Sequence, residues 1–138
     1  MLEQILLVAG ALIFGVLGSI HLLYTLAGNK FDPRDAATRV AMQATSPVIS
    51  RRTTMWQAWI GFNASHSLGA MVFAAFMLLL ALRHMDFLRA NPAFAWLALG
   101  NAAAWFAVGW RYWFRTPLVG IGLAGVCFLI AAARLSLA

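Results

Sequence analysis

The amino-acid sequence predicts an all-α integral membrane protein: a bundle of four transmembrane helices with a short interfacial helix in the first loop. Of its 138 residues, 63% are hydrophobic and only 10% are charged, whereas about one quarter of the residues in a soluble domain are charged. The apolar residues also form four runs near the length of about 20 residues that a bilayer-crossing helix needs. We therefore expect a single four-helix transmembrane domain over residues 1–138.

The four spans are predicted at residues 4–27, 55–82, 92–110 and 117–133. The first lacks the basic segment of a signal peptide and has a longer apolar stretch, so we expect it to be retained. The second is about 40 Å long by helical rise, and should tilt or protrude into water. Pro92 and Pro117 suit the first turns of the third and fourth helices, where a missing N–H is tolerated.

The first connection, residues 28–54, is the only long one. Asp32 is expected to cap a short helix there, with Pro33 at the first helical position. This helix should end before Pro47 and lie on the membrane surface. The alternative is a structured lid over the bundle.

Basic residues predict the orientation of the spans. The formal net charge is +6, and seven of the ten Lys and Arg residues lie in the first and third connections. By the positive-inside rule, loops 28–54 and 111–116 should be cytoplasmic and both termini periplasmic, in a bacterial inner (plasma) membrane. The run WRYWFR, residues 110–115, is typical of an interfacial anchor that contacts membrane lipids. No nucleic-acid partner is expected.

Polar side chains inside the apolar runs are the candidate functional residues, because lipid offers them no hydrogen-bond partner. Helical spacing puts Trp59, Asn63 and His66 on one face of the second span. Spans joined in sequence are usually neighbours, so contact between His21 and His66 is expected first. The candidate ligand-binding residues are His21, Trp59, Asn63, His66, Ser67, Asn101 and Trp105.

A second face of the same span carries small residues. Gly61, Ser65 and Gly69 recur at every fourth position, a pattern that lets another helix approach closely. The partner helix could belong to the bundle itself, to a homodimer or to another membrane protein.

Three interpretations of the polar cluster remain open. It could supply only interhelical hydrogen bonds. It could hold a hydrophobic small molecule, a lipid or a partner helix in a non-catalytic binding or accessory protein. It could serve a small membrane enzyme, an isomerase or a haem or quinone redox protein, in which His66 acts with His21 as acid–base group or both histidines bind haem b. No catalytic residue can be assigned.

The predicted spans contain few residue types that catalytic, transport or metal sites need, and this disfavours several functions. No Asp or Glu lies inside a span, so neither a complete catalytic triad nor a small pump with a buried Glu is expected. Zinc would need further strong ligands. The single cysteine, Cys127, cannot form an intramolecular disulfide.

The segments GSIHLLYTL and MWQAWIGFNASHSLGA, with the long polar loop between them, resemble an uncharacterised family of small bacterial inner-membrane proteins with four spans. The architecture is also similar to that of DoxX-like four-helix membrane proteins. The resemblance implies a bacterial inner membrane and no agreed activity, and likeness of fold does not establish function.

Overall fold

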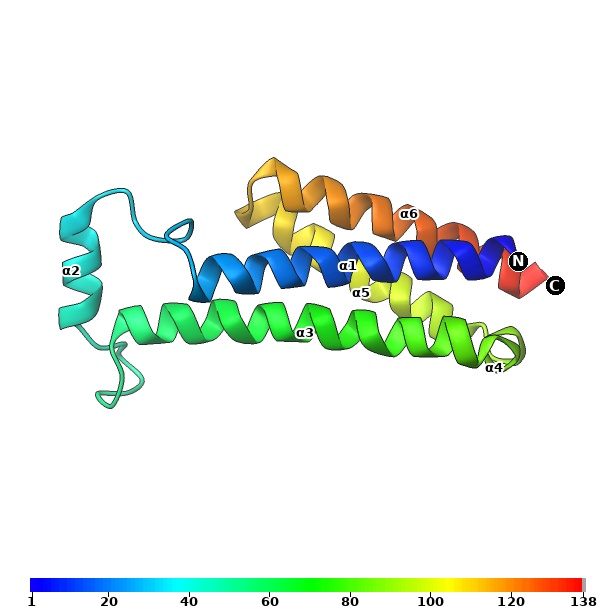
Figure 1. The fold of residues 1–138 in the computed structure, drawn as a ribbon, viewed down its shortest axis with the longest axis horizontal. Coiled ribbons are helices and arrows are strands. Elements are labelled where there is room, and N and C mark those ends of the chain that lie inside the picture. Colours follow the sequence, from blue (N-terminus) through cyan, green and yellow to red (C-terminus); the bar gives the residue numbers. More distant parts are fainter. Residues whose placement is uncertain (138) are drawn as a thin grey trace. The chain divides into compact units, whose positions relative to one another are not determined.

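The computed structural model describes residues 1–137, and this part of the chain is all-α. Its helices are α1 (Leu2–Leu26), α2 (Ala36–Ala44), α3 (Met55–Arg83), α4 (Met85–Ala90), α5 (Ala93–Tyr112) and α6 (Arg115–Leu137) (Figure 1). Helices α1, α3, α5 and α6 are long and apolar enough to cross a membrane. The predicted fold class is confirmed, and the protein is a multi-pass membrane protein.

The helix ends lie close to the predicted span ends, with two differences. Helix α6 continues to Leu137 rather than ending at residue 133. The polar residue Ser136 is accommodated in this last turn because its Oγ donates to the Ala132 carbonyl at 2.9 Å. The short helix α4 was not predicted. Its buried residues are Met85 and Leu88, too few to give a periodic pattern.

The chain divides into two compact units. Unit 1 contains Met1–Leu17 and the chain from Ala70 onwards, and unit 2 is Gly18–Gly69. Helices α1 and α3 each contribute residues to both units. The organisation of residues 1–138 as one four-helix domain therefore stays a prediction.

Unit 1 has an aromatic core to which all four long helices contribute. Phe14 of α1 is fully buried. Its ring centroid lies 4.9 Å from that of Phe73 on α3, 5.5 Å from Trp105 on α5 and 6.3 Å from Phe128 on α6. The first two contacts are edge-to-face, an arrangement that aromatic pairs prefer. One side chain thus contacts all three other long helices of unit 1.

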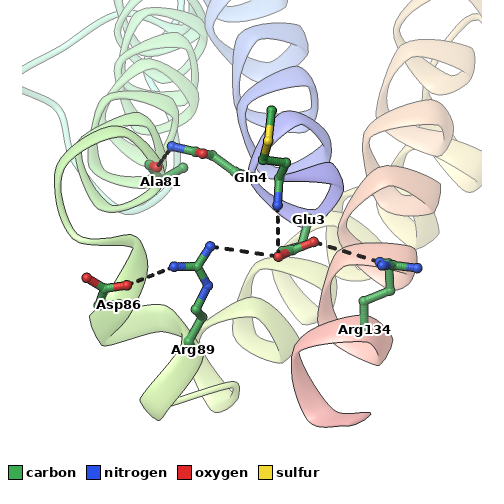
Figure 2. A network of polar contacts seen from close by, with 7 residues as sticks. Glu3, Gln4, Ala81, Asp86, Arg89 and Arg134 are labelled. Atoms are coloured by element: carbon green, nitrogen blue, oxygen red, sulfur yellow. Dashed lines mark hydrogen bonds and ion pairs between the residues drawn. The ribbon is translucent and has the colours of Figure 1, made fainter. Parts of the chain in front are cut away.

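A polar network lies at one end of unit 1 (Figure 2). The Glu3 carboxylate of α1 is 3.9 Å from Arg89 Nη2 of α4 and 3.8 Å from Arg134 Nε of α6. Arg89 also donates to Asp86 Oδ1 at 2.8 Å. Both arginine side chains are about half exposed, so solvent screens each pair. The network connects helix ends without adding much stability.

Unit 2 contains the last turns of α1, the connecting segment with α2, and the first turns of α3. Within unit 2, α2 runs across the direction of the last turns of α1 and the first turns of α3 (Figure 1). The predicted short helix is therefore present. The predicted cap is wrong: Asp35, not Asp32, is the N-cap, and its carboxylate accepts hydrogen bonds from Ala37 N at 3.1 Å and Thr38 Oγ1 at 3.0 Å. Asp32 instead accepts from Arg39 Nη1 at 2.7 Å.

Helix α3 begins with a capping box. Gln57 N–H donates to Thr54 Oγ1 at 3.2 Å, and Thr54 N–H donates to Gln57 Oε1 at 3.1 Å. This reciprocal pair satisfies backbone donors that a helix start leaves free. Gln57 is thus a helix cap and not a polar group inside the span.

The Asp35 cap is expected to depend on pH. The Ala37 N–H and the Thr38 hydroxyl donate to the carboxylate and hold the pKa of Asp35 below its usual value. A lowered folded-state pKa stabilises α2 fully above the unfolded-state value, about 3.9, and this contribution is lost as the pH falls through the folded-state pKa. Backbone chemical shifts of α2 during an acid titration should therefore move toward coil values.

Two variants separate the cap from other acid effects. Asp35→Ala should show the weakened helix already at neutral pH, because its side chain has no acceptor. Asp35→Asn should keep α2 in acid, because an amide oxygen caps without titrating. Equal acid responses in Asp35→Asn and the native chain would contradict this assignment.

Candidate functional site

Unit 2 brings His21 of α1 into hydrogen-bond contact with Asn63 of α3. His21 Nε2 lies 3.0 Å from Asn63 Oδ1. Because an amide oxygen only accepts, His21 donates through Nε2. Asn63 is only 7% exposed, so this bond is shielded and fixes the imidazole relative to α3.

Asn63 extends this contact into a chain of hydrogen bonds. Its Nδ2 donates to the Trp59 carbonyl at 2.8 Å, and Trp59 Nε1 donates to the Phe31 carbonyl at 3.2 Å. The Asn63 carbonyl accepts from Ser67 Oγ at 2.9 Å, and Ser67 is fully buried. The chain leads from the His21 imidazole to the loop residue Phe31.

The His21 ring also contacts two other rings. Its centroid lies 4.3 Å from that of Phe31 and 5.4 Å from that of His66, with interplanar angles of 36° and 57°. The predicted pairing of His21 with His66 is therefore present as a ring contact. The His21 carbonyl accepts from Thr25 Oγ1 at 2.8 Å. The hydrogen bond to Asn63 and the two ring contacts together orient the imidazole.

This geometry does not fit a haem with His21 and His66 as axial ligands. Such ligands stand on opposite sides of the iron, and metal–imidazole bonds are about 2 Å each. With the distance from each nitrogen to its ring centre added, the separation exceeds the 5.4 Å found here. The Nε2 proton of His21 is also donated to Asn63. Within residues 1–137, no three His, Cys, Asp or Glu side chains gather as a metal site.

An open pocket of about 360 Å³ lies in unit 2 and is lined by Phe31, Asp32, Pro33, Met42 and Trp59. Small-molecule pockets are commonly about 300–1,000 Å³. The lining is apolar except for Asp32, whose carboxylate is paired with Arg39 at 2.7 Å. Phe31 and Trp59 line the pocket and also belong to the hydrogen-bond chain. The pocket is therefore adjacent to the His21–Asn63 pair.

Phe31 and Met42 were not among the predicted site residues. Both lie in the polar connecting segment, where no helical or strand period marks them. Phe31 is the only aromatic residue in residues 28–54. This was the one sequence feature that could have indicated a pocket residue. An aromatic residue alone in a polar loop often has a partner elsewhere in the fold.

Asn101 and Trp105 lie on α5 in unit 1. Trp105 belongs to the aromatic core, with its ring centroid 5.5 Å from that of Phe14 and 5.9 Å from that of Trp113. Asn101 Nδ2 is buried without a hydrogen-bond partner within residues 1–137. The predicted association of Asn101 and Trp105 with His21 stays a prediction.

The two glycines of the small-residue track on α3 have no closely packed neighbour within unit 2. A Cβ added at Gly61 or Gly69 would meet no atom within 4 Å, and Ser65 is exposed. Close approach is found instead in unit 1, where a Cβ at Gly15 would lie 3.3 Å from Ala74 Cβ. All three partners predicted for the track therefore stay predictions: a helix of the bundle itself, a homodimer or a second membrane protein.

No family model, curated protein or solved structure matches this chain. What the site can do is therefore inferred from its side chains. With Nε2 protonated in the neutral ring, Nδ1 of His21 is left as an acceptor. The pocket lining can accommodate an apolar group, and the His21–Asn63 pair lies behind two of the lining residues, Phe31 and Trp59.

The His21–Asn63 bond should be measurable by a double-mutant cycle. We expect a coupling free energy of about 0.6 kcal/mol, and at most about 1.7 kcal/mol, between His21→Ala and Asn63→Ala. Unfolding by SDS titration in mixed micelles measures it. The exposed His84 provides the control, since His84→Ala combined with Asn63→Ala should be additive. Additivity for the His21 pair would contradict the contact.

Proposed function

We propose that the protein is a non-catalytic membrane protein that binds a hydrophobic small molecule or a lipid chain in the pocket of unit 2. One observation carries this proposal: Phe31 and Trp59 line the pocket and also contact the polar pair. A molecule in the pocket would therefore touch residues bonded directly to the His21–Asn63 pair. The polar pair would then respond to the occupant.

The pocket lining supports an apolar ligand. Phe31, Pro33, Met42 and Trp59 present carbon surface, and the one carboxylate, Asp32, is neutralised by Arg39. Methionine adapts its shape to irregular ligands. A volume of about 360 Å³ is at the small end of the usual range, so a single chain or ring system fits better than a whole phospholipid.

The neighbouring polar groups support a ligand with one small polar end. The His21–Asn63 pair contacts two of the residues that line the pocket, Phe31 and Trp59. Such polar groups usually orient an otherwise apolar ligand. An alcohol, a carbonyl or a carboxyl group on an apolar body has this chemistry.

The proposal is tested by filling the pocket. Met42→Trp should reduce the amount of small molecule or lipid retained on the purified protein in native mass spectrometry, because the larger ring occupies the cavity. Val40→Trp is the matched control, since Val40 lies on the same helix and is 63% exposed. Equal retention by both variants and the native chain, or no retained molecule in any of them, would overturn the proposal.

The second candidate is a small membrane enzyme, such as an isomerase, that uses His66 with His21. The contact between the two imidazole rings, 5.4 Å between centroids, favours it, because adjacent imidazoles can move a proton. Solvent exchange distinguishes the two candidates. Deuterium incorporation from D2O into the retained molecule by the native chain, but not by His66→Gln, would favour the enzyme.

We infer a bacterial inner-membrane location with periplasmic termini and cytoplasmic loops 28–54 and 111–116. The charge distribution supports it, with seven basic residues in those loops and three elsewhere. A C-terminal alkaline phosphatase fusion should be active and a C-terminal fluorescent-protein fusion dark. The opposite pair of results would reverse the orientation.

A further inference from the structure

Residues 46–54, between α2 and α3, form a closed loop, here named the tip loop. Met55 N donates to the Thr45 carbonyl at 2.8 Å, so the two ends of the loop are joined. Compact surface loops with joined ends frequently carry function. At its far end, Ser50 N donates to the Pro47 carbonyl at 3.1 Å and closes a turn. The tip loop is thus held in one shape by its own hydrogen bonds.

The apex of this turn is apolar. Val48 and Ile49 are its two central residues, and they are 109% and 94% exposed. Turn centres usually contain Gly, Pro, Asn, Asp or Ser, whereas β-branched side chains favour strands. Neither turn geometry nor packing within unit 2 accounts for two β-branched apolar side chains here. A contact outside the chain would account for them.

Two arginines follow the apex directly. Arg51 and Arg52 are exposed, and Arg52 N donates to Ser50 Oγ at 3.2 Å, which fixes the backbone there. The tip loop contains no acidic residue. The acids of the connecting segment are engaged elsewhere, because Asp32 binds Arg39 and Asp35 caps α2. The apolar apex is therefore accompanied by uncompensated positive charge.

We propose that the tip loop docks onto an anionic phospholipid leaflet, with Val48 and Ile49 in the interfacial region and Arg51 and Arg52 on lipid phosphates. The loop is part of the connection between α1 and α3, which are both long and apolar enough to span a membrane, so a bilayer surface is within reach. Arginine binds phosphate through paired N–H donors. Anionic lipid attracts basic segments at the membrane surface.

The placement of the tip loop within unit 2 agrees with this occupant. It lies beside the start of α3, on the side away from α1 in Figure 1. The pocket residue Met42 is on α2, outside the tip loop. The lipid-docking proposal and the pocket proposal therefore rest on different residues. An experiment can reject one of them without rejecting the other.

Spin labels at two positions test the docking. In a Cys127→Ala background, Ile49→Cys and Val40→Cys are labelled and reconstituted in nanodiscs of phosphatidylcholine alone or mixed with phosphatidylglycerol. Power saturation compares accessibility to oxygen, which is enriched in the bilayer, with accessibility to a water-soluble nickel complex. We expect the oxygen-to-nickel ratio at position 49 to rise several-fold with phosphatidylglycerol, while the ratio at position 40 changes little.

A second pair of variants tests the arginines. Arg51→Gln with Arg52→Gln should abolish the effect of phosphatidylglycerol at position 49, whereas Arg111→Gln with Arg115→Gln should leave it in place. Circular dichroism confirms that each variant keeps its helix content. A label at position 49 that is equally accessible to nickel in both lipid mixtures, or equally inserted in both, would overturn the proposal. Protection found only in native membranes would indicate a protein partner and would also overturn it.

Discussion

Replacing Phe14 by alanine is expected to lower the free energy of unfolding by about 3 kcal/mol, the lower end of the range for a buried aromatic residue. Phe14 is fully buried and contacts rings on all three other long helices of unit 1. In a membrane the transfer of the side chain from lipid contributes little, so the loss comes mainly from the cavity and the missing van der Waals contacts. This places the expected effect at the lower end.

SDS titration of the protein in mixed micelles measures this change. Phe62→Ala is the matched control, because Phe62 is 70% exposed on α3 and its ring fills no space in the core. We expect the control to change the free energy of unfolding by less than about 0.5 kcal/mol, as surface substitutions do. Similar losses in both variants would mean that the aromatic contacts of Phe14 do not hold unit 1 together.

Replacing Gly10 by alanine is expected to destabilise the protein by up to about 2 kcal/mol. A Cβ at Gly10 would lie 2.6 Å from Cε1 and 2.8 Å from Cζ of Phe128. The Phe128 ring is fully buried, so it has no free space to move into. Overpacking costs about 1–3 kcal/mol, and the higher helix propensity of alanine offsets about 1 kcal/mol of this.

The opposite sign is expected at Gly100 on α5. A Cβ there would meet nothing within 4 Å, so Gly100→Ala should gain up to about 1 kcal/mol from helix propensity alone. The same titration compares the two variants. A stabilised Gly10→Ala would show that α1 and α6 do not approach as closely as the structure places them.

The membrane helices could be predicted from the sequence because composition alone determines them. A run of about 20 apolar residues has few alternatives to a span, and all four runs became helices. Helix α4 could not be predicted in the same way. It is held by two buried side chains, Met85 and Leu88, whose burial depends on the rest of unit 1.

The contact between the polar residues of α1 and α3 could be predicted from the sequence, but the pocket could not. Helical spacing put Asn63 and His66 on one face, and neighbouring spans brought His21 to them. The pocket instead depends on how residues 28–54 fold back. The error at the cap of α2 has the same origin: Asp32 and Asp35 are both suitable cap residues by type, and in the folded segment Asp35 caps α2 while Asp32 binds Arg39.

The glycines show a further limit of sequence spacing. Gly61 and Gly69 form the regular small-residue pattern, yet a Cβ at either would meet no atom within 4 Å in the described chain. Gly10 is in no such pattern, yet it contacts the Phe128 ring. Which glycine needs to be small depends on the facing side chain, and spacing along one helix does not specify that side chain.

The pocket proposal is tested most directly by photo-crosslinking with palmitic acid that carries a diazirine in mid-chain. After irradiation in nanodiscs, peptide mass spectrometry locates the modified residues. We expect crosslinks concentrated at Phe31, Met42 and Trp59, suppressed by excess unlabelled palmitic acid and lost in Met42→Trp. Crosslinks spread over exposed apolar residues such as Leu123 and Val126, without competition by palmitic acid, would contradict a ligand site in unit 2.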